Sequence, residues 1–145
     1  MTDIRKLAER REKLHEEHAS SRPLSRDYEY IGLKGEELLA AILGTDIDEE
    51  DRPAGDNGVD ARKSGYTYDI KTARKPYNLL VEQGKCNADI YILARYDDTT
   101  DSATPIGWEL GLIIKDTIPR DVGGYGIISH AIPADELRPM DTLPK

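Results

Sequence analysis

Two strand-like runs joined by a two-residue link place the strongest constraint on how this chain can fold. The runs are residues 59–63 and 66–71, and Ser64 and Gly65 form the link between them. A two-residue link with glycine at a position that requires positive φ is typical of a tight β-hairpin. The sequence therefore predicts an antiparallel strand pair in this region.

The register of this hairpin places two carboxylates next to each other. With the turn at residues 64 and 65, Ala61 faces Tyr68 and Asp60 faces Asp69. Because side chains alternate along a strand, Lys71 lies on the same face as Asp69, about 6.6 Å further along. Opposed like charges are destabilising unless something compensates, and a bound cation would do so. Oxygen ligands of this kind favour Mg²⁺, Mn²⁺ or Ca²⁺.

A third acid lies in a predicted helix. Residues 32–44 have a helical pattern that we expect to end near Gly44. Leu39, Ala40 and Leu43 follow Glu36 at the i+3, i+4 and i+7 positions, so Glu36 projects from the apolar stripe. A glutamate directed at a core needs a partner, and a metal site is one candidate. The other is an ordinary first-turn glutamate favoured by the helix dipole.

In their order along the chain, these segments resemble the PD-(D/E)xK nuclease superfamily, particularly its small single-domain phage and prokaryotic members. The resemblance covers residues 28 to 145, and its motifs are Gly32-Leu-Lys-Gly-Glu36, Gly55-Asp-Asn-Gly-Val-Asp60 and Tyr68-Asp-Ile-Lys-Thr-Ala-Arg74.

The resemblance implies a metal-dependent nuclease that hydrolyses phosphodiester bonds of DNA, with RNA not excluded. It implies Mg²⁺ or Mn²⁺ as the cofactor, Lys71 as a catalytic residue, and three catalytic acids that also bind metal: Glu36, Asp60 and Asp69. Ile70 is implied as a further metal position. Asp56 is a second candidate acid, and we prefer Asp60 because it faces Asp69.

Three other interpretations remain open. The Asp-x-Lys pattern alone also occurs on solvated strand faces. A nucleic-acid-binding or structural module could keep the fold and cleave poorly or not at all. Among nucleases, a Holliday junction resolvase or another enzyme would carry the same constellation, because these enzymes differ in surface and oligomer geometry rather than in catalytic face. A two-fold dimer would let two sites address both strands.

The predicted fold class is α/β, with a mixed β-sheet flanked by helices; the resemblance implies a restriction-endonuclease-like core. Residues 1–26 are expected to form a charged N-terminal helix and linker, and residues 27–145 the nuclease-like domain. Residues 89–95 read as a strand buried on both faces. Further strands are expected at residues 106–108, 110–114 and 125–132.

The charge distribution bears on the partner. A net charge of −8 and a pI of about 4.9 argue against generic nucleic-acid binding. Residues 61–95, however, carry seven Lys or Arg against three acids. Basic residues after a strand are more often solubilising than phosphate-binding. The residues that we expect to contact nucleic acid are Arg62, Thr72, Arg74, Lys75 and Lys85.

The remaining features concern location and metal chemistry. No apolar run approaches the ~18 residues of a membrane span, and the charged N-terminus lacks a signal-peptide core, so we expect a cytoplasmic protein without a membrane partner. Cys86 is the single cysteine, which excludes an intramolecular disulfide, and we expect it to be buried. His15 and His18 lie one helical turn apart and could bind a metal, but Glu16 and Glu17 lie between them, so we favour a solvated helix face.

Overall fold

The computed structural model describes residues 4–6, 28–45 and 60–145. Most of the predicted N-terminal helix, with His15 and His18, and the alternative acid Asp56 lie outside the described residues. Residues 4–6 are helical, and Ile4 packs against Leu33.

Helix α2 spans Tyr28–Leu43 and presents a buried face that includes Ile31, Leu39 and Leu43. It ends at Gly44, which has a φ of +70°. The N–H of the following Thr45 donates to the Ala40 carbonyl at 2.9 Å, the bond that closes a Schellman cap. The predicted helix end at Gly44 is therefore confirmed.

The predicted hairpin is present as strands β1 (Ala61–Lys63) and β2 (Tyr66–Ala73). Ser64 and Gly65 both have positive φ, 54° and 84°, as a type I′ turn requires. The predicted pairing of Ala61 with Tyr68 is confirmed, and Lys63 pairs with Tyr66 beside the turn. Asp60 lies one residue before β1 rather than within it.

Four strands form the central sheet, in the order β1-β2-β4-β5. Strand β4 spans Ile90–Asp97 and runs parallel to β2, whereas β5, Ser102–Leu110, runs antiparallel to β4. The sheet is therefore mixed, as predicted. Strands β3 (Asn78–Glu82) and β6 (Ser129–Pro133) form a second, two-stranded antiparallel sheet that we did not expect.

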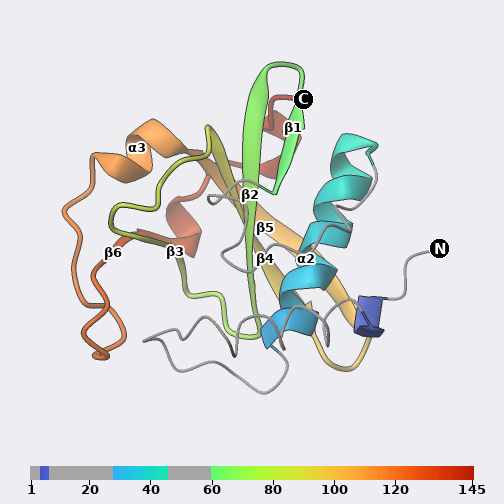
Figure 1. The fold of residues 1–145 in the computed structure, drawn as a ribbon, viewed down its shortest axis with the longest axis horizontal. Coiled ribbons are helices and arrows are strands. Elements are labelled where there is room, and N and C mark those ends of the chain that lie inside the picture. Colours follow the sequence, from blue (N-terminus) through green and yellow to red (C-terminus); the bar gives the residue numbers. More distant parts are fainter. Residues whose placement is uncertain (1–3, 7–27, 46–59) are drawn as a thin grey trace.

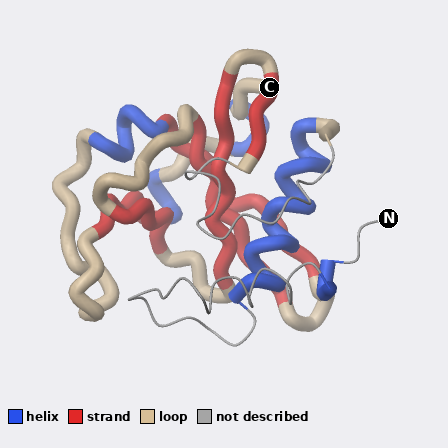
Figure 2. The backbone as a smooth tube through the Cα atoms, in the orientation of Figure 1, coloured by secondary structure: helices blue, strands red, loops and turns tan. Residues whose placement is uncertain are grey.

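The elements form layers on both faces of the central sheet (Figures 1 and 2). Helix α2 covers one face, where Leu39 and Leu43 pack against Ile92. Strands β3 and β6 cover the other face, where Leu79 packs near Leu93. Because successive residues of β4 alternate between the two cores, the strand is buried on both faces, as its apolar run predicted.

The expected strand at residues 110–114 is wrong. Strand β5 ends at Leu110, and residues Gly111–Lys115 form the short helix α3. Gly111 starts this helix against the backbone of Ala88, and its N–H donates to the Asp89 carbonyl at 2.8 Å. A short apolar run has no periodicity that separates a strand from a buried helical turn.

The expected strand at residues 125–132 is partly wrong, because β6 begins only at Ser129. Gly124 and Gly126 have positive φ, 78° and 80°, which is incompatible with an extended strand. Both glycine N–H groups donate to the Asp121 carboxylate, at 2.7 and 2.9 Å. The segment is therefore a loop that folds around Asp121.

The C-terminal part of the chain supports the end of the sheet. Two 3₁₀ turns, Ala134–Glu136 and Met140–Thr142, follow β6. Trp108 is buried, and its indole N–H donates to the Pro139 carbonyl at 2.9 Å. Cys86 is a buried free thiol, as predicted. No helix in the described parts of the chain is both long enough and apolar enough to cross a membrane.

Candidate active site

Two of the predicted site residues lie on the same face of β2. The side chain of Asp69 is buried, with 5% of it exposed, whereas 41% of the Lys71 side chain is exposed. Lys71 Nζ lies 2.8 Å from Asp69 Oδ2. This oxygen is buried and receives no well-aligned hydrogen bond from the described residues. The ion pair with Lys71 is therefore the main interaction that offsets the cost of burying the Asp69 charge.

Asp60 takes the place of a strand partner at the edge of β2. Strand β1 pairs with β2 from Tyr66 to Tyr68. At the next position the Asp60 N–H donates to the Tyr68 carbonyl at 2.7 Å, and the Ile70 N–H donates to Asp60 Oδ2 at 2.8 Å. Past Ile70, no described strand pairs with this edge of β2. Among the described residues, the site therefore lies where the pairing between β1 and β2 ends.

The surroundings of Asp60 disfavour its charged form. Burial raises the pKa of Asp60 well above its ordinary value, and the negative charge of Asp69, together with a hydrogen bond to it, raises the pKa further. The charge of Glu36 acts in the same direction, whereas the Ile70 N–H lowers the pKa. Such crowding of carboxyl groups is typical of functional sites.

Lys71 responds in the opposite way. Burial by itself lowers the pKa of the Lys71 ammonium, but the carboxylates of Asp69 and Asp60 outweigh burial and raise this pKa above its ordinary value. Lys71 is therefore a fixed positive charge at neutral pH. In this arrangement it can donate hydrogen bonds and stabilise negative charge, but it cannot accept a proton.

Glu36 approaches the other two acids from helix α2. It is half-buried, and its charge is close enough to raise the pKa of Asp60. The structure thus brings together four predicted residues: Glu36, Asp60, Asp69 and Lys71. The Ile70 side chain belongs to the core beneath α2 and its N–H is bonded to Asp60, so any metal ligand from Ile70 would have to be its carbonyl oxygen.

The donor set has the chemistry that Mg²⁺ or Mn²⁺ requires, because it offers hard carboxylate oxygens and a buried Asp69 oxygen whose main partner is Lys71. However, the described residues contain no group of three or more His, Cys, Asp or Glu side chains arranged to hold a metal ion. Lys71 supplies the counter-charge instead. A divalent cation would need to share Asp69 with Lys71.

The residues expected to contact nucleic acid do not form one patch. Arg62 is exposed on β1 opposite Thr67, whereas Lys75 is exposed just after β2 ends. Thr67, which faces Arg62, and Arg74, which precedes Lys75, are about 23 Å apart along the extended strand. Arg62 and Lys75 therefore lie near opposite ends of β2. Lys85 is exposed and lies 3.3 Å from Glu82.

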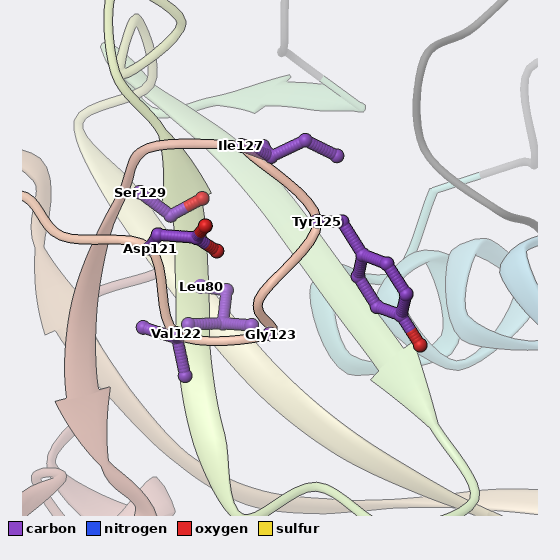
Figure 3. A pocket seen from close by; sticks show the side chains of 7 residues that line it. All are labelled: Leu80, Asp121, Val122, Gly123, Tyr125, Ile127 and Ser129. Atoms are coloured by element: carbon purple, nitrogen blue, oxygen red, sulfur yellow. The ribbon is translucent and has the colours of Figure 1, made fainter.

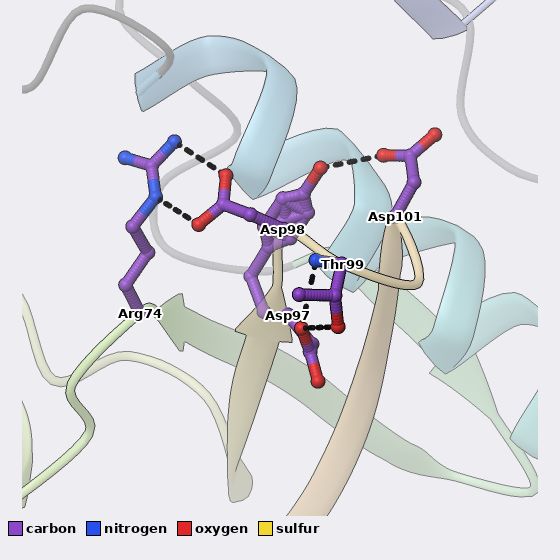
Figure 4. Close-up of polar contacts among 6 residues, drawn as sticks. Arg74, Asp97, Asp98, Thr99 and Asp101 are labelled. Carbon is purple, nitrogen blue, oxygen red and sulfur yellow. Dashed lines mark hydrogen bonds and ion pairs between the residues drawn. The ribbon is translucent and has the colours of Figure 1, made fainter.

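Two of the residues expected to contact nucleic acid are not free to do so, because one has a buried hydroxyl and the other is hydrogen-bonded within the protein. Thr72 Oγ1 is buried, which removes it from the surface. The Arg74 guanidinium makes two hydrogen bonds to Asp98, from Nε at 2.8 Å and from Nη2 at 3.0 Å (Figure 4). Asp98 is in the turn between β4 and β5, where the carboxylate of Asp97 also accepts hydrogen bonds from Thr99. A phosphate would therefore compete with Asp98 for Arg74.

A shallow pocket lies away from these residues, beside the loop before β6 (Figure 3). Asp121 lines it, but its carboxylate is already bonded to Gly124 and Gly126. Its other lining residues bring no second titratable group apart from the phenol of Tyr125. The pocket therefore offers no alternative catalytic constellation.

The sequence analysis included Gly35 in a motif but gave it no role in the site. Gly35 is buried in the interior of α2, directly before Glu36, and packs against Thr72. A glycine in a helix interior is unfavourable compared with alanine, and this cost is a signal of close packing.

Comparisons of the chain with protein-family models, curated proteins and solved structures give no match. The resemblance to PD-(D/E)xK nucleases therefore depends on the sequence motifs alone, and the four residues that carry it come together in the structure.

Proposed function

We propose that this protein is a Mg²⁺- or Mn²⁺-dependent nuclease that hydrolyses phosphodiester bonds of DNA. One observation carries the proposal. The carboxyl group of Asp69, which is buried, and that of Asp60, which is half-buried, lie side by side where β1 begins to pair with β2, with Glu36 close by and Lys71 paired to Asp69. Crowded carboxyl groups cost folding free energy, and proteins commonly retain such a cost where function requires it.

In this proposal Glu36, Asp60 and Asp69 hold the cation, together with the Ile70 carbonyl. When bound, the cation lowers the pKa of a water molecule and polarises the phosphate. The Ile70 N–H orients the Asp60 carboxylate, and a bound cation would favour the charged form of this group. Lys71 donates hydrogen bonds to the attacking water or to a phosphate oxygen, and its charge stabilises the negative charge that develops there.

The main alternative is a nucleic-acid-binding module that does not cleave. The ion pair between Lys71 and Asp69 favours this alternative, because it neutralises Asp69 without a metal. The two functions differ in the fate of the substrate, so cleavage decides between them.

The test is incubation of the purified protein with Mn²⁺ and a panel of supercoiled, linear, single-stranded and four-way-junction DNA, with RNA included. We expect cleavage of at least one DNA substrate, and we expect Asp69→Asn and Lys71→Met each to lower the rate about 100-fold or more. Cleavage of the junction in preference to the other substrates would identify a resolvase.

Glu109→Gln is the matched control. Glu109 is also buried and is also paired to a basic residue, since Arg138 Nε lies 2.7 Å from its Oε1. Glu109 takes no part in the proposed site, so its variant should keep the wild-type rate. Binding without cleavage, or cleavage that survives Asp69→Asn and Lys71→Met, would exclude the proposed nuclease site.

A further inference from the structure

A glycine in helix α2 contacts the site strand at a distance that no other residue type allows. A Cβ atom built on Gly35 would lie 1.9 Å from Thr72 Oγ1 and 3.1 Å from Thr72 Cβ. Real Cβ atoms essentially never approach another heavy atom to within 3.0 Å. A side chain at position 35 would therefore force either the Thr72 side chain to rotate or the helix and strand to move apart, and the 3.1 Å distance to Thr72 Cβ would stay tight even after a rotation.

The strand side of this contact is also unusual. Thr72 Oγ1 is buried and has no hydrogen-bond partner among the described residues. A buried hydroxyl without a partner is unfavourable, and so is a glycine in a helix interior. These two unfavourable features meet at one point, one residue before Glu36 on α2 and one residue after Lys71 on β2. Because both features coincide, we infer that this contact serves to bring the backbone of α2 close to β2.

We propose that the contact between Gly35 and Thr72 sets the depth of α2 on β2 and thereby places the Glu36 carboxylate beside Asp60. Both are positioning residues, because they act through Glu36. If Thr72 keeps its rotamer, moving a methyl group at position 35 from 1.9 Å to the 3.4 Å of ordinary packing displaces the helix by about 1.5 Å. A displacement of about 1 Å in an active site can lower a rate 100-fold. This inference rests on the proposed function, which gives Glu36 its role.

The same helix offers a matched control. Gly32 lies about one turn before Gly35 in α2, and a Cβ atom built on it would meet no heavy atom within 4 Å. Gly32→Ala and Gly35→Ala therefore make the same chemical change in the same helix. One of them creates a clash with β2 and the other does not.

The first measurement is structural and does not depend on activity. Crystal structures of the wild type and of both variants give the separation between the Glu36 and Asp60 carboxylates. We expect this separation to increase by about 1 Å in Gly35→Ala and to stay unchanged in Gly32→Ala. An unchanged separation in Gly35→Ala overturns the positioning role, whether or not the protein is a nuclease.

The second measurement is the Mn²⁺-dependent rate on the substrate that the wild type cleaves, well below the melting temperature of each variant. We expect kcat to fall about 10- to 100-fold in Gly35→Ala, with a smaller change in KM, and to stay at the wild-type value in Gly32→Ala. Equal kcat values for the two variants would contradict the positioning role. A wild type that cleaves nothing overturns the proposed function, and the carboxylate separation then decides the positioning role alone.

A compensating substitution completes the test. Thr72→Ala removes the atom at 1.9 Å and leaves 3.1 Å as the shortest distance to the new methyl group. Adding it to Gly35→Ala should recover at least tenfold in kcat and shorten the carboxylate separation. If Gly35→Ala does not fold, recovery of a folded protein by the added Thr72→Ala supports the contact, and failure to recover it overturns the proposal.

Discussion

Asp60 shows how one residue can connect the fold with the proposed chemistry. Its carboxylate accepts the Ile70 N–H and so completes the hydrogen bonding of β2 where β1 begins. The same carboxyl group is crowded by Asp69 and Glu36, and it is also desolvated. Asp60 therefore helps to hold the sheet together while its charge opposes folding.

This conflict predicts that Asp60→Asn stabilises the metal-free protein at neutral pH. The pKa of Asp60 is raised on folding, so its contribution to stability is full at low pH and is lost as the pH rises through the raised pKa. Asparagine keeps an acceptor for the Ile70 N–H and carries no charge. We expect the melting temperature in the presence of a chelator to rise by roughly 3 °C or more at about pH 8.

The effect should depend on pH in a specified direction. At about pH 4 the Asp60 carboxyl is protonated in the native protein, so the gain from Asp60→Asn should largely disappear. The measurement is the melting temperature of both proteins across the pH range. A variant that is less stable than the wild type at every pH would show that the carboxylate contributes more as a hydrogen-bond acceptor than it costs as a charge.

The contacts of individual residues could be predicted only when the two partners lie close together in the sequence. The proximity of Asp60 and Asp69 follows from a two-residue turn between them, so the local sequence determined it. The bond from Arg74 to Asp98 spans 24 residues and depends on how β2 and β4 pair. The burial of Thr72 depends on the depth of helix α2. Neither leaves a local signal in the sequence.

At the level of elements, the long or well-bounded segments were predictable and the short ones were not. Helix α2 has an apolar stripe and a terminal glycine, and strand β4 has an apolar run too short for a helix of typical length. The segment 110–114 has neither signal. Its helical conformation depends on the approach of Gly111 to the backbone of Ala88, which is distant in sequence.

This explanation of α3 predicts that Gly111→Ala is strongly destabilising. A Cβ atom built on Gly111 would lie 2.1 Å from the Ala88 carbonyl oxygen, a backbone atom that cannot move as a flexible side chain can. We expect a loss of about 1–3 kcal/mol in the free energy of unfolding, measured by chemical denaturation. Leu112→Ala on the same helix is the control, because Leu112 is 79% exposed and should change stability by less than about 0.5 kcal/mol. Similar losses for both variants would refute the packing explanation.

For the whole molecule, the net negative charge and the cluster of acids in the site both affect the approach of a substrate phosphate. A chain with a net charge of −8 resists any further approach of negative charge, including that of a substrate phosphate. A divalent cation bound by Glu36, Asp60 and Asp69 would reduce this repulsion at the point where a phosphate must enter.

The native protein should therefore be stabilised by Mn²⁺. A ligand that binds the native state alone stabilises it by RT ln(1 + [L]/Kd), which is about 2.7 kcal/mol when the free ligand is at 100 times Kd. In a chain of this size, that corresponds to a rise of roughly 6–10 °C in melting temperature. Scanning calorimetry with millimolar Mn²⁺ measures it.

Two variants show whether such a rise comes from the proposed site. Asp69→Asn should remove most of the rise in melting temperature. Glu109→Gln should retain it, because the Glu109 carboxylate is paired with Arg138 outside the proposed site. An equal rise in both variants would place the cation at another position, and no rise in the wild type would count against a metal site.

The shortness of β1 divides the site between two levels of local stability. Strand β1 has three residues and lies at the edge of the sheet, whereas β2 is paired along most of its length with the buried strand β4. Short edge elements open without global unfolding, but central strands open only with it. We therefore expect Asp60 to lie in a part of the chain that opens locally, and Asp69 and Lys71 to lie in a strand that opens only with global unfolding. Transient opening of the hairpin would therefore remove Asp60 from the site and leave Asp69 and Lys71 in place.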